Sequence, residues 1–353
     1  MSGSLNESVV PTATATRMHA EAAETADAVA RQFEANAPVI DALVQRLKAQ
    51  PPAFIVTCAR GSSDHAATYG KYLFETTLGL VTASASPSVG SVYAVRPHLK
   101  GALFVAISQS GKSPDLVRNA EIARAAGALV VALVNVEDSP LAQIADTVIP
   151  LRAGPEKSVA ATKSYLCSLA ALLQLAARWS GDAKLLAAVD ALPGALREAW
   201  QMDWSPVVEG LKDARNLFVV GRGLGLGAAQ EAALKFKETC GLHAEAFSSA
   251  EVKHGPMAIV GPGFPVLAFA QDDDTCASTM SVAEEFHQRG APVWVALPGA
   301  KGPDVLPMPA SPHPACTPLL TVQCFYKAVN ALAVARGHNP DVPPHLNKVT
   351  ETV

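Results

Sequence analysis

The sequence predicts an α/β protein built from two subdomains, each a parallel sheet flanked by helices. Short apolar runs alternate with helix-length amphipathic segments, a pattern typical of a parallel sheet covered on both faces. The same pattern starts again near residue 216, so the chain reads as two copies of one unit. A length of 353 residues suits two units of roughly 150 residues each.

The amino-acid composition limits the kinds of molecule that the protein is expected to bind. The chain is 49% hydrophobic and 17% charged, which allows a large buried core. Its formal charge of -4, without a long Lys/Arg run, argues against nucleic acid or an anionic membrane. No stretch reaches the roughly 18 consecutive apolar residues of a membrane span. Small molecules and protein partners remain.

The N-terminal segment, residues 1–15, is polar and rich in small residues. It lacks the apolar core of a secretion signal, so we expect a disordered N-terminus and a cytoplasmic protein. The six cysteines are scattered, with no CxxC and no His at metal-ligand spacing, so we expect reduced thiols and no metal site.

The first subdomain is expected over residues 16–200 and opens with helices. Apolar residues recur at three- and four-residue spacing over residues 18–50, which predicts helix, with a break at Pro38. Five strands and three helices should follow. The strands are predicted at residues 53–58, 80–83, 102–107, 129–134 and 147–151. The helices are predicted at residues 115–126, 162–179 and 183–200.

The second subdomain is expected over residues 201–340, with an extended tail over residues 341–353 that contains Pro343 and Pro344. Its strands are predicted at residues 216–220, 265–270 and 292–297, and its helices at residues 228–239 and 279–289. In both halves the first strand runs into a glycine-containing turn, at residues 61–63 and 221–223.

The strongest chemical signal follows the strand at residues 102–107. The chain continues Ser108-Gln109-Ser110-Gly111-Lys112-Ser113-Pro114, in which Ser113 suits a helix N-cap and Pro114 a first helical residue. Free backbone N–H groups at a helix start, together with hydroxyl donors, favour a phosphate monoester. An ordinary serine-rich turn is the alternative.

Two nucleotide motifs are weaker. Gly111-Lys112-Ser113 resembles the end of a Walker A loop, but Ala106 stands where that motif needs glycine. Residues 223–228 meet the G-x-G-x-x-A dinucleotide fingerprint after a strand. The motif requires an acidic residue at the end of a second strand, which would be Glu245. Residues 242–247 are not a convincing buried strand, so a dinucleotide enzyme is the less favoured hypothesis.

A helix then carries Glu231, Lys235 and Glu238 at i, i+4 and i+7, on one face. A surface ion-pair ladder is the plain interpretation. The apolar neighbours predict a partly buried helix, on which a Glu/Lys cluster favours function. His254 lies on a loop closed by Gly-Pro, and His243 competes for any catalytic role.

Together these segments resemble the sugar isomerase (SIS) domain family, especially the isomerase half of glucosamine-6-phosphate synthase and stand-alone SIS-type glucosamine-6-phosphate deaminases. The resemblance covers the chain from about residue 18 onward. The matching motifs are Ser108-Gln-Ser-Gly111, Glu231-x-x-x-Lys235-x-x-Glu238, His243-Ala-Glu-Ala246, Glu251-x-x-His254-Gly-Pro256 and the Lys348 tail.

The resemblance implies two flavodoxin-like SIS subdomains, a homodimer with shared active sites, a hexosamine phosphate ligand and no cofactor. It implies that Glu238 moves a proton between C1 and C2 and that Lys235 stabilises the charge that develops. His254 would assist ring opening, from the partner's chain, and Lys348 would close over the sugar. The residues implied to hold the phosphate are Ser63, Ser108, Gln109, Ser110 and Ser113.

Departures from the synthase pattern shape the expected activity. Ala161 replaces a sugar-contacting serine, Asn347 replaces an alanine, and no glutaminase domain fits before residue 18. The sequence is therefore expected to encode a glucosamine-6-phosphate deaminase that yields fructose 6-phosphate and ammonia. A galactosamine-6-phosphate deaminase/isomerase, a fructosamine phosphate deglycase and a non-catalytic sugar-phosphate sensor are the alternatives.

Overall fold

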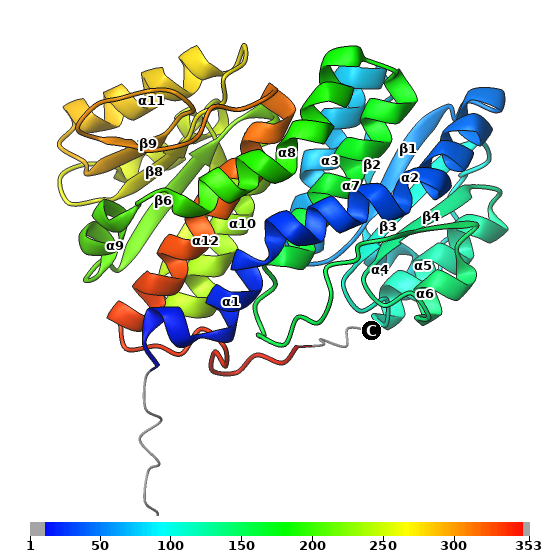
Figure 1. Cartoon of the computed structure of the whole chain (residues 1–353), viewed down its shortest axis with the longest axis horizontal. Coiled ribbons are helices and arrows are strands. Elements are labelled where there is room, and N and C mark those ends of the chain that lie inside the picture. Colours follow the sequence, from blue (N-terminus) through cyan, green and yellow to red (C-terminus); the bar gives the residue numbers. More distant parts are fainter. Residues whose placement is uncertain (1–10, 349–353) are drawn as a thin grey trace, which may run out of the picture.

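The computed structural model describes residues 11–348, which form two parallel five-stranded sheets with helices between and around them (Figure 1). The strand orders are β2-β1-β3-β4-β5 and β10-β9-β8-β6-β7. Numbered within its own half, each sheet runs 2-1-3-4-5, which is the flavodoxin-like order. The predicted fold, two parallel sheets flanked by helices, is confirmed.

The first sheet agrees closely with the predicted strands. Its central strand β3 is buried along its whole length, as expected of an apolar run between neighbours on both sides. The strands are β1 (Phe54–Cys58), β2 (Thr82–Ser84), β3 (Ala102–Ser108), β4 (Leu129–Val134) and β5 (Thr147–Pro150). The helices of this half are α1 (Arg17–Ala23), α2 (Thr25–Ala49), α3 (Ser62–Leu78), α4 (Pro87–Ser91), α5 (Pro114–Ala125), α6 (Pro140–Ile144), α7 (Lys163–Ser180) and α8 (Ala183–Gln201).

The second sheet repeats the plan with shorter outer strands. Its strands are β6 (Asn216–Gly221), β7 (His243–Ser248), β8 (Val266–Phe269), β9 (Val293–Ala296) and β10 (Val305–Leu306). Its helices are α9 (Ser205–Leu211), α10 (Leu226–Cys240), α11 (Cys276–Gln288) and α12 (Thr317–Ala335). Short 3-10 helices lie at Ala13–Ala15, Gly223–Gly225, Glu251–Lys253, Pro256–Ile259 and Pro314–Cys316.

Local expectations at two places in the chain need correction. Residues 243–248 do form a strand, the edge strand β7 paired in parallel with β6, but, as the sequence indicated, it is not a buried one, since Glu245 in its middle is exposed. Ala13–Ala15 form a 3-10 helix, so the expected disorder does not extend to these residues, and residues 1–10 lie outside the described part of the chain.

The predicted break at Pro38 is also wrong, because α2 continues through it. Proline costs a helix interior roughly 3 kcal/mol, so other contacts must offset it. Asn36, just before the proline, donates from Nδ2 to Pro150 O at 2.7 Å and accepts at Oδ1 from Arg152 Nε at 2.9 Å. Ile40 and Leu43, just after it, are buried in the core. Packing on both sides of Pro38 therefore keeps one helix.

Helices α3, α7, α10 and α12 fill the space between the two sheets (Figure 1). By length and hydropathy residues 314–335, which include α12, could cross a membrane, but 78% of that window is buried inside the protein. Burial among α8, α9 and α10 explains the apolar sequence of α12 as core packing.

The two halves approach most closely where α3 meets α10. A Cβ atom on Gly227 would lie 2.5 Å from the His65 carbonyl oxygen and 3.1 Å from the Tyr69 nitrogen, so only glycine fits without a shift of the backbone. Tyr165 on α7 donates to the Gly227 carbonyl at 3.2 Å. The contact fixes α10 of the second half against α3 of the first.

After α12 the chain returns beneath the helices toward the first sheet (Figure 1). Asp341 accepts hydrogen bonds from the backbone N–H groups of Arg17 and Met18, both at 2.8 Å, and so caps the start of α1. Its carbonyl accepts from the Val159 N–H at 3.3 Å. This anchor brings residues 346–348 to the mouth of the site described next.

Candidate active site

A cavity of about 320 Å³ opens at the carboxyl ends of β1 and β3. These neighbouring strands form the switch point of a flavodoxin-like sheet, which is where ligands bind in such folds. The cavity is lined by Arg60, Gly61, Ser62, Ser63, Ile107, Ser108, Gln109, Ser110, Ser113, Leu116, Val159, Ala161, Glu238, Leu346, Asn347 and Lys348. Residues from both halves and from the tail therefore share one cavity.

One wall is the anion cradle, residues 108–113, between β3 and α5. Ser113 is the N-cap of α5 and Pro114 its first residue, as predicted. Gly111 adopts a φ of 63° and donates its N–H to Ser108 Oγ at 3.0 Å. The N-terminus of α5 then points its partial positive charge at the cavity. All five predicted phosphate residues, Ser63, Ser108, Gln109, Ser110 and Ser113, line the cavity.

The opposite wall is the C-terminal part of α10. Glu238 lines the cavity with its side chain 21% exposed, whereas Lys235 is fully buried behind it. The Lys235 ammonium donates to Glu238 Oε2 and, at 3.1 Å, to Ser62 Oγ. Lys235 therefore touches the carboxylate that faces the cavity, while its own ammonium stays out of the cavity lining.

Glu231, the third charged residue on this face of α10, is also fully buried. It accepts from Ser62 Oγ at 3.1 Å and Tyr326 Oη at 2.9 Å, and its other oxygen lies 3.0 Å from His65 Nδ1. Its Oε1 is 3.5 Å from Lys235 Nζ. The Glu/Lys face of α10 is thus a buried cluster that joins the two halves, and the interpretation as a surface ladder is wrong.

The buried cluster keeps its charges. Burial on its own would raise the pKa of Glu231, but Lys235, His65 and Tyr326 outweigh it, and the pKa lies below its ordinary value. Burial would lower the pKa of Lys235, but Glu231 and Glu238 outweigh it and raise that pKa. Lys235 is therefore a permanent ammonium at neutral pH, suited to electrostatic stabilisation rather than nucleophilic attack.

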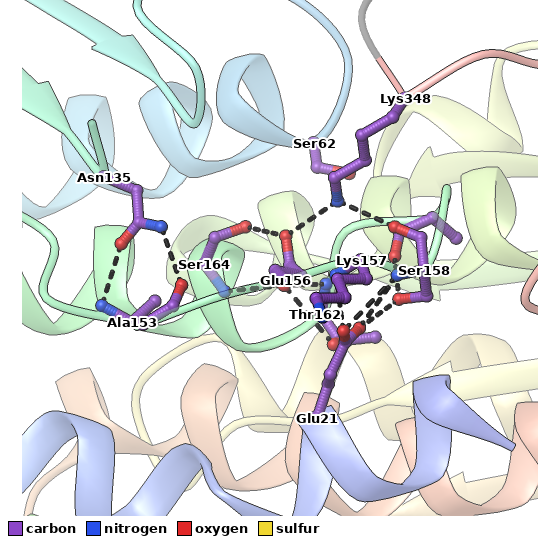
Figure 2. A network of polar contacts seen from close by, with 12 residues as sticks. Glu21, Ser62, Asn135, Ala153, Glu156, Lys157, Ser158, Thr162, Ser164 and Lys348 are labelled. Carbon is purple, nitrogen blue, oxygen red and sulfur yellow. Dashed lines mark hydrogen bonds and ion pairs between the residues drawn. The ribbon is translucent and has the colours of Figure 1, made fainter.

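The third wall is the strap, residues 151–162, between β5 and α7, which contributes Val159 and Ala161 to the cavity. Figure 2 shows how buried side chains hold it. Asn135 donates to the Gly154 carbonyl and accepts from the Ala153 N–H, both at 2.9 Å. Glu21 reaches up from α1 and accepts from Ser158, through both its N–H and its hydroxyl.

The strap also holds the tail through Glu156, whose carboxylate is fully buried (Figure 2). Glu156 accepts from Ser164 Oγ at 2.6 Å and from Lys348 Nζ at 3.2 Å, and Lys348 also donates to the Ser158 carbonyl at 2.7 Å. Burial alone would raise the pKa of Glu156, but Lys348 and the hydrogen bonds from Ser164 and Thr162 outweigh it, so the pKa is lowered. A charged Glu156 thus fixes Lys348 at the cavity.

The structure does not bring either candidate histidine to this cavity. His254 is exposed at the end of the 3-10 helix Glu251–Lys253, and His243 is exposed at the start of β7. The cavity of the described chain therefore contains Glu238 and Lys348 from the predicted catalytic set, with Lys235 directly behind Glu238 and His254 elsewhere.

Several residues of the site were not predicted. Arg60 and Ser62 line the cavity at the turn after β1, and Glu21 and Glu156 hold the strap. The strand-to-glycine turn at residues 61–63 was the available signal for the first pair. No local pattern points to Glu21, because its partner Ser158 is 137 residues away in the sequence.

The second sheet lacks a matching cradle. After β8 the chain reads Gln271-Asp272-Asp273-Asp274, so carboxylates stand where the first half has hydroxyl groups. The glycines of the dinucleotide fingerprint serve packing: a Cβ on Gly225 would lie 2.7 Å from Gln271 Nε2, and Gly227 meets α3. Within residues 11–348, no group of three His, Cys, Asp or Glu residues is placed to hold a metal ion.

Comparison with known proteins places these features in context. The SIS domain family model matches residues 53–178 and 210–305. The glutamine–fructose-6-phosphate aminotransferase [isomerizing] of Aeropyrum pernix is 36% identical over 308 residues, which cover 82% of this chain and 49% of the relative. The enzyme of the same name from Thermotoga maritima is 33% identical over 349 residues, 88% of this chain and 56% of the relative. The chain thus spans about half the length of these curated relatives.

Solved structures with a similar fold come from the same group of proteins. A crystal structure from Silicibacter pomeroyi DSS-3, described as a phosphosugar isomerase whose sugar is not named, has a TM-score of 0.87 and 44% identity, covering 92% of this chain and 100% of that one. The C-terminal domain of the glucosamine-fructose-6-phosphate aminotransferase of Francisella tularensis has a TM-score of 0.83 and 26% identity, covering 93% and 98%. A glucosamine-6-phosphate deaminase from Thermotoga maritima, at 22% identity and a TM-score of 0.77, shares the fold over 96% of this chain and 100% of that one.

Proposed function

This chain belongs to the SIS domain family of phosphosugar isomerases, and on that premise we propose that it is a glucosamine-6-phosphate deaminase. The reaction takes glucosamine 6-phosphate and water to fructose 6-phosphate and ammonia. The observation that carries the proposal is the single cavity of about 320 Å³ with an anion cradle on one wall and Glu238 on the other.

The proposed reaction starts with the open-chain sugar, its phosphate held by the cradle. Glu238 removes the proton from C2, the C–H electrons form the C1–C2 double bond of an enolamine, and the C1 oxygen takes the negative charge. The same carboxylate returns the proton to C1, and a proton passes from the nitrogen to the C1 oxygen, which leaves a ketose imine at C2. Water adds to that imine, and ammonia leaves as the carbonyl of fructose 6-phosphate forms.

The other residues serve this transfer. Lys235 meets Glu238 from behind and keeps a positive charge near the forming anion, which lowers the barrier. Lys348, held by Glu156, presents its ammonium at the cavity mouth. Ring opening needs a group that exchanges protons near neutral pH, and we assign it to His254 of a second copy in a homodimer.

Two observations bear on the choice of an amino-sugar substrate and of a reaction different from that of the synthases. The curated relatives carry fructose-6-phosphate aminotransferase in their names, and their matched half corresponds to this chain. Ala161 in the cavity wall removes a hydroxyl group from the sugar's surroundings, which favours a pocket different from that of the synthases. Galactosamine 6-phosphate and a fructosamine phosphate share the same proton transfer and are the alternatives to test.

The test is incubation of the purified chain with glucosamine 6-phosphate and separate assays for ammonia and fructose 6-phosphate. Equal amounts of both products are expected. Galactosamine 6-phosphate and a 6-phosphofructosamine run in parallel identify the preferred sugar. If neither product rises above background with glucosamine 6-phosphate, the proposed reaction is wrong; a phosphosugar that binds without turnover would favour a sensor.

A further inference from the structure

Arg60 is a cation in the cavity that the proton transfer does not use. It lies two residues after the end of β1, at the switch point, and its side chain is 48% exposed. The cavity lining contains two cationic residues among the described part of the chain, Arg60 and Lys348. Lys348 uses two of its three N–H donors on the buried Glu156 and the Ser158 carbonyl, whereas arginine has five, so Arg60 is the better placed of the two to meet an added negative charge.

Asp115, the second residue of α5, holds the guanidinium in place. Arg60 donates from Nε at 2.8 Å and from Nη2 at 2.7 Å to the same Asp115 oxygen, and the Asp115 side chain is fully buried. The other Asp115 oxygen accepts from the Leu116 N–H at 2.8 Å. These contacts use two of the five N–H donors of arginine. The contacts with Asp115 hold the Arg60 guanidinium beside the N-terminus of α5, where the anion cradle ends.

Binding of a phosphate in this region requires a cation beside Asp115. A phosphate monoester carries about two negative charges at neutral pH. The cradle residues that line the cavity supply hydroxyl groups, the Gln109 amide and backbone N–H groups, all of them neutral, and the exposed Lys112 lies outside the lining. Asp115, on the first turn of α5, adds a buried negative charge next to them. A bound dianion beside this carboxylate would be repelled unless a cation stood between them.

We infer that Arg60 is a phosphate-binding and specificity-determining residue, which bridges Asp115 and the phosphate group of the sugar. This inference rests on the proposed function, since it names the group that selects a phosphorylated sugar at that same site. Its predicted effect is on affinity for the phosphate group, whichever sugar carries it.

The experiment measures binding by calorimetry, with fructose 6-phosphate and inorganic phosphate as probes, for the full chain and three variants. Arg60→Gln should weaken both ligands about tenfold, as expected for one lost, partly exposed hydrogen bond to a charged group. Arg60→Lys loses the same paired contact with Asp115 but keeps the charge, and it should recover most of the affinity. Arg118→Ala removes an exposed arginine of α5 outside the cavity and should leave both constants unchanged.

The outcomes separate the two proposals. If Arg60→Gln binds both probes within twofold of the wild type, or if Arg60→Lys loses as much as Arg60→Gln, the inference is overturned while the sugar reaction stands. If the wild type binds inorganic phosphate in an Arg60-dependent way but not fructose 6-phosphate, the inference stands and the proposed substrate falls. A wild type that binds neither probe overturns both.

Discussion

Glu238 is the carboxylate that lines the described cavity, so the proposed reaction depends first on its ability to accept a proton. Glu238→Gln keeps the size of the side chain and an oxygen that can accept from Lys235, but removes the base. We expect turnover to fall about 10²–10⁴-fold while substrate affinity stays within about tenfold. Steady-state rates and calorimetric binding measure the two effects.

The control for Glu238→Gln is Glu245→Gln, which changes an exposed carboxylate on β7 that is not part of the cavity lining. It should leave turnover unchanged. A Glu238→Gln variant as active as the wild type would show that another group carries the proton.

A second residue-scale prediction concerns the buried pair of Glu231 and Lys235. Lys235→Met leaves Glu231 buried without its cation, which should cost about 3–5 kcal/mol in the free energy of unfolding. The double variant Glu231→Gln/Lys235→Met removes both charges and should be more stable than Lys235→Met alone. Urea unfolding followed by circular dichroism measures both. Equal stability of the single and double variants would contradict a coupled pair.

The same pair predicts the direction of acid sensitivity. The pKa of Glu231 is lower in the folded chain than in the unfolded one, so its contribution is full above the ordinary carboxyl pKa and is lost as the pH falls. The pKa of Lys235 is raised, so its contribution is lost only at strongly alkaline pH. As the pH falls below the ordinary carboxyl pKa of 4.5, the wild type should therefore lose more stability than the double variant, which urea unfolding at a series of acidic pH values measures.

At the residue scale, the sequence predicted what is local. The five residues that the resemblance implies for phosphate binding follow two strands in sequence, and the structure places all five in the lining of one cavity. Glu156 was not predicted, because its contact with Lys348 joins residues 192 positions apart. His254 lies on an exposed turn outside the cavity lining of the described chain. Its proposed role depends on contacts between two copies of the chain, which a local sequence pattern does not specify.

At the scale of elements, the strap and the tail form one unit through Glu156. We expect Glu156→Gln to weaken the hold on Lys348, since an amide replaces the buried carboxylate that receives its ammonium. Amide hydrogen exchange should then speed up in peptides covering residues 340–348, with a parallel loss of turnover. Glu137→Gln alters an exposed carboxylate paired with Arg152 and serves as the control. Unchanged exchange in the tail would show that Asp341 alone anchors it.

The elements themselves were predictable where burial and periodicity agree. β4 matches its predicted bounds at residues 129–134, because every residue in that run is apolar and the strand lies between β3 and β5. β7 was not predicted, since exposed polar residues at 243 and 245 hide an edge strand. Pro38 misled the prediction of α2 because long-range packing, which a local rule does not see, outweighs the local cost.

At the scale of the whole molecule, the proposed homodimer shares its active sites, with His254 supplied across the interface. His254→Ala and Glu238→Gln should each be inactive alone. Coexpression gives mixed dimers in which one of the two sites has both native residues. With random assortment about half of the dimers are mixed, so about a quarter of wild-type activity should return in the mixture, and about half in mixed dimers isolated through two affinity tags. A mixture as inactive as its parents would contradict shared sites, and His243→Ala in place of His254→Ala identifies the histidine.

Gly227 has a consequence for which sugars this architecture can accept. The phosphate-holding wall stands on the first half and the base on the second, and the missing side chain at position 227 lets α3 and α10 touch along their backbones. In the proposed function, that contact sets the distance between the residues that bind the phosphate at one end of the sugar and the carboxylate that reacts near the other end. We therefore expect the spacing of these two helices to limit the length of phosphorylated sugar that the cavity accepts.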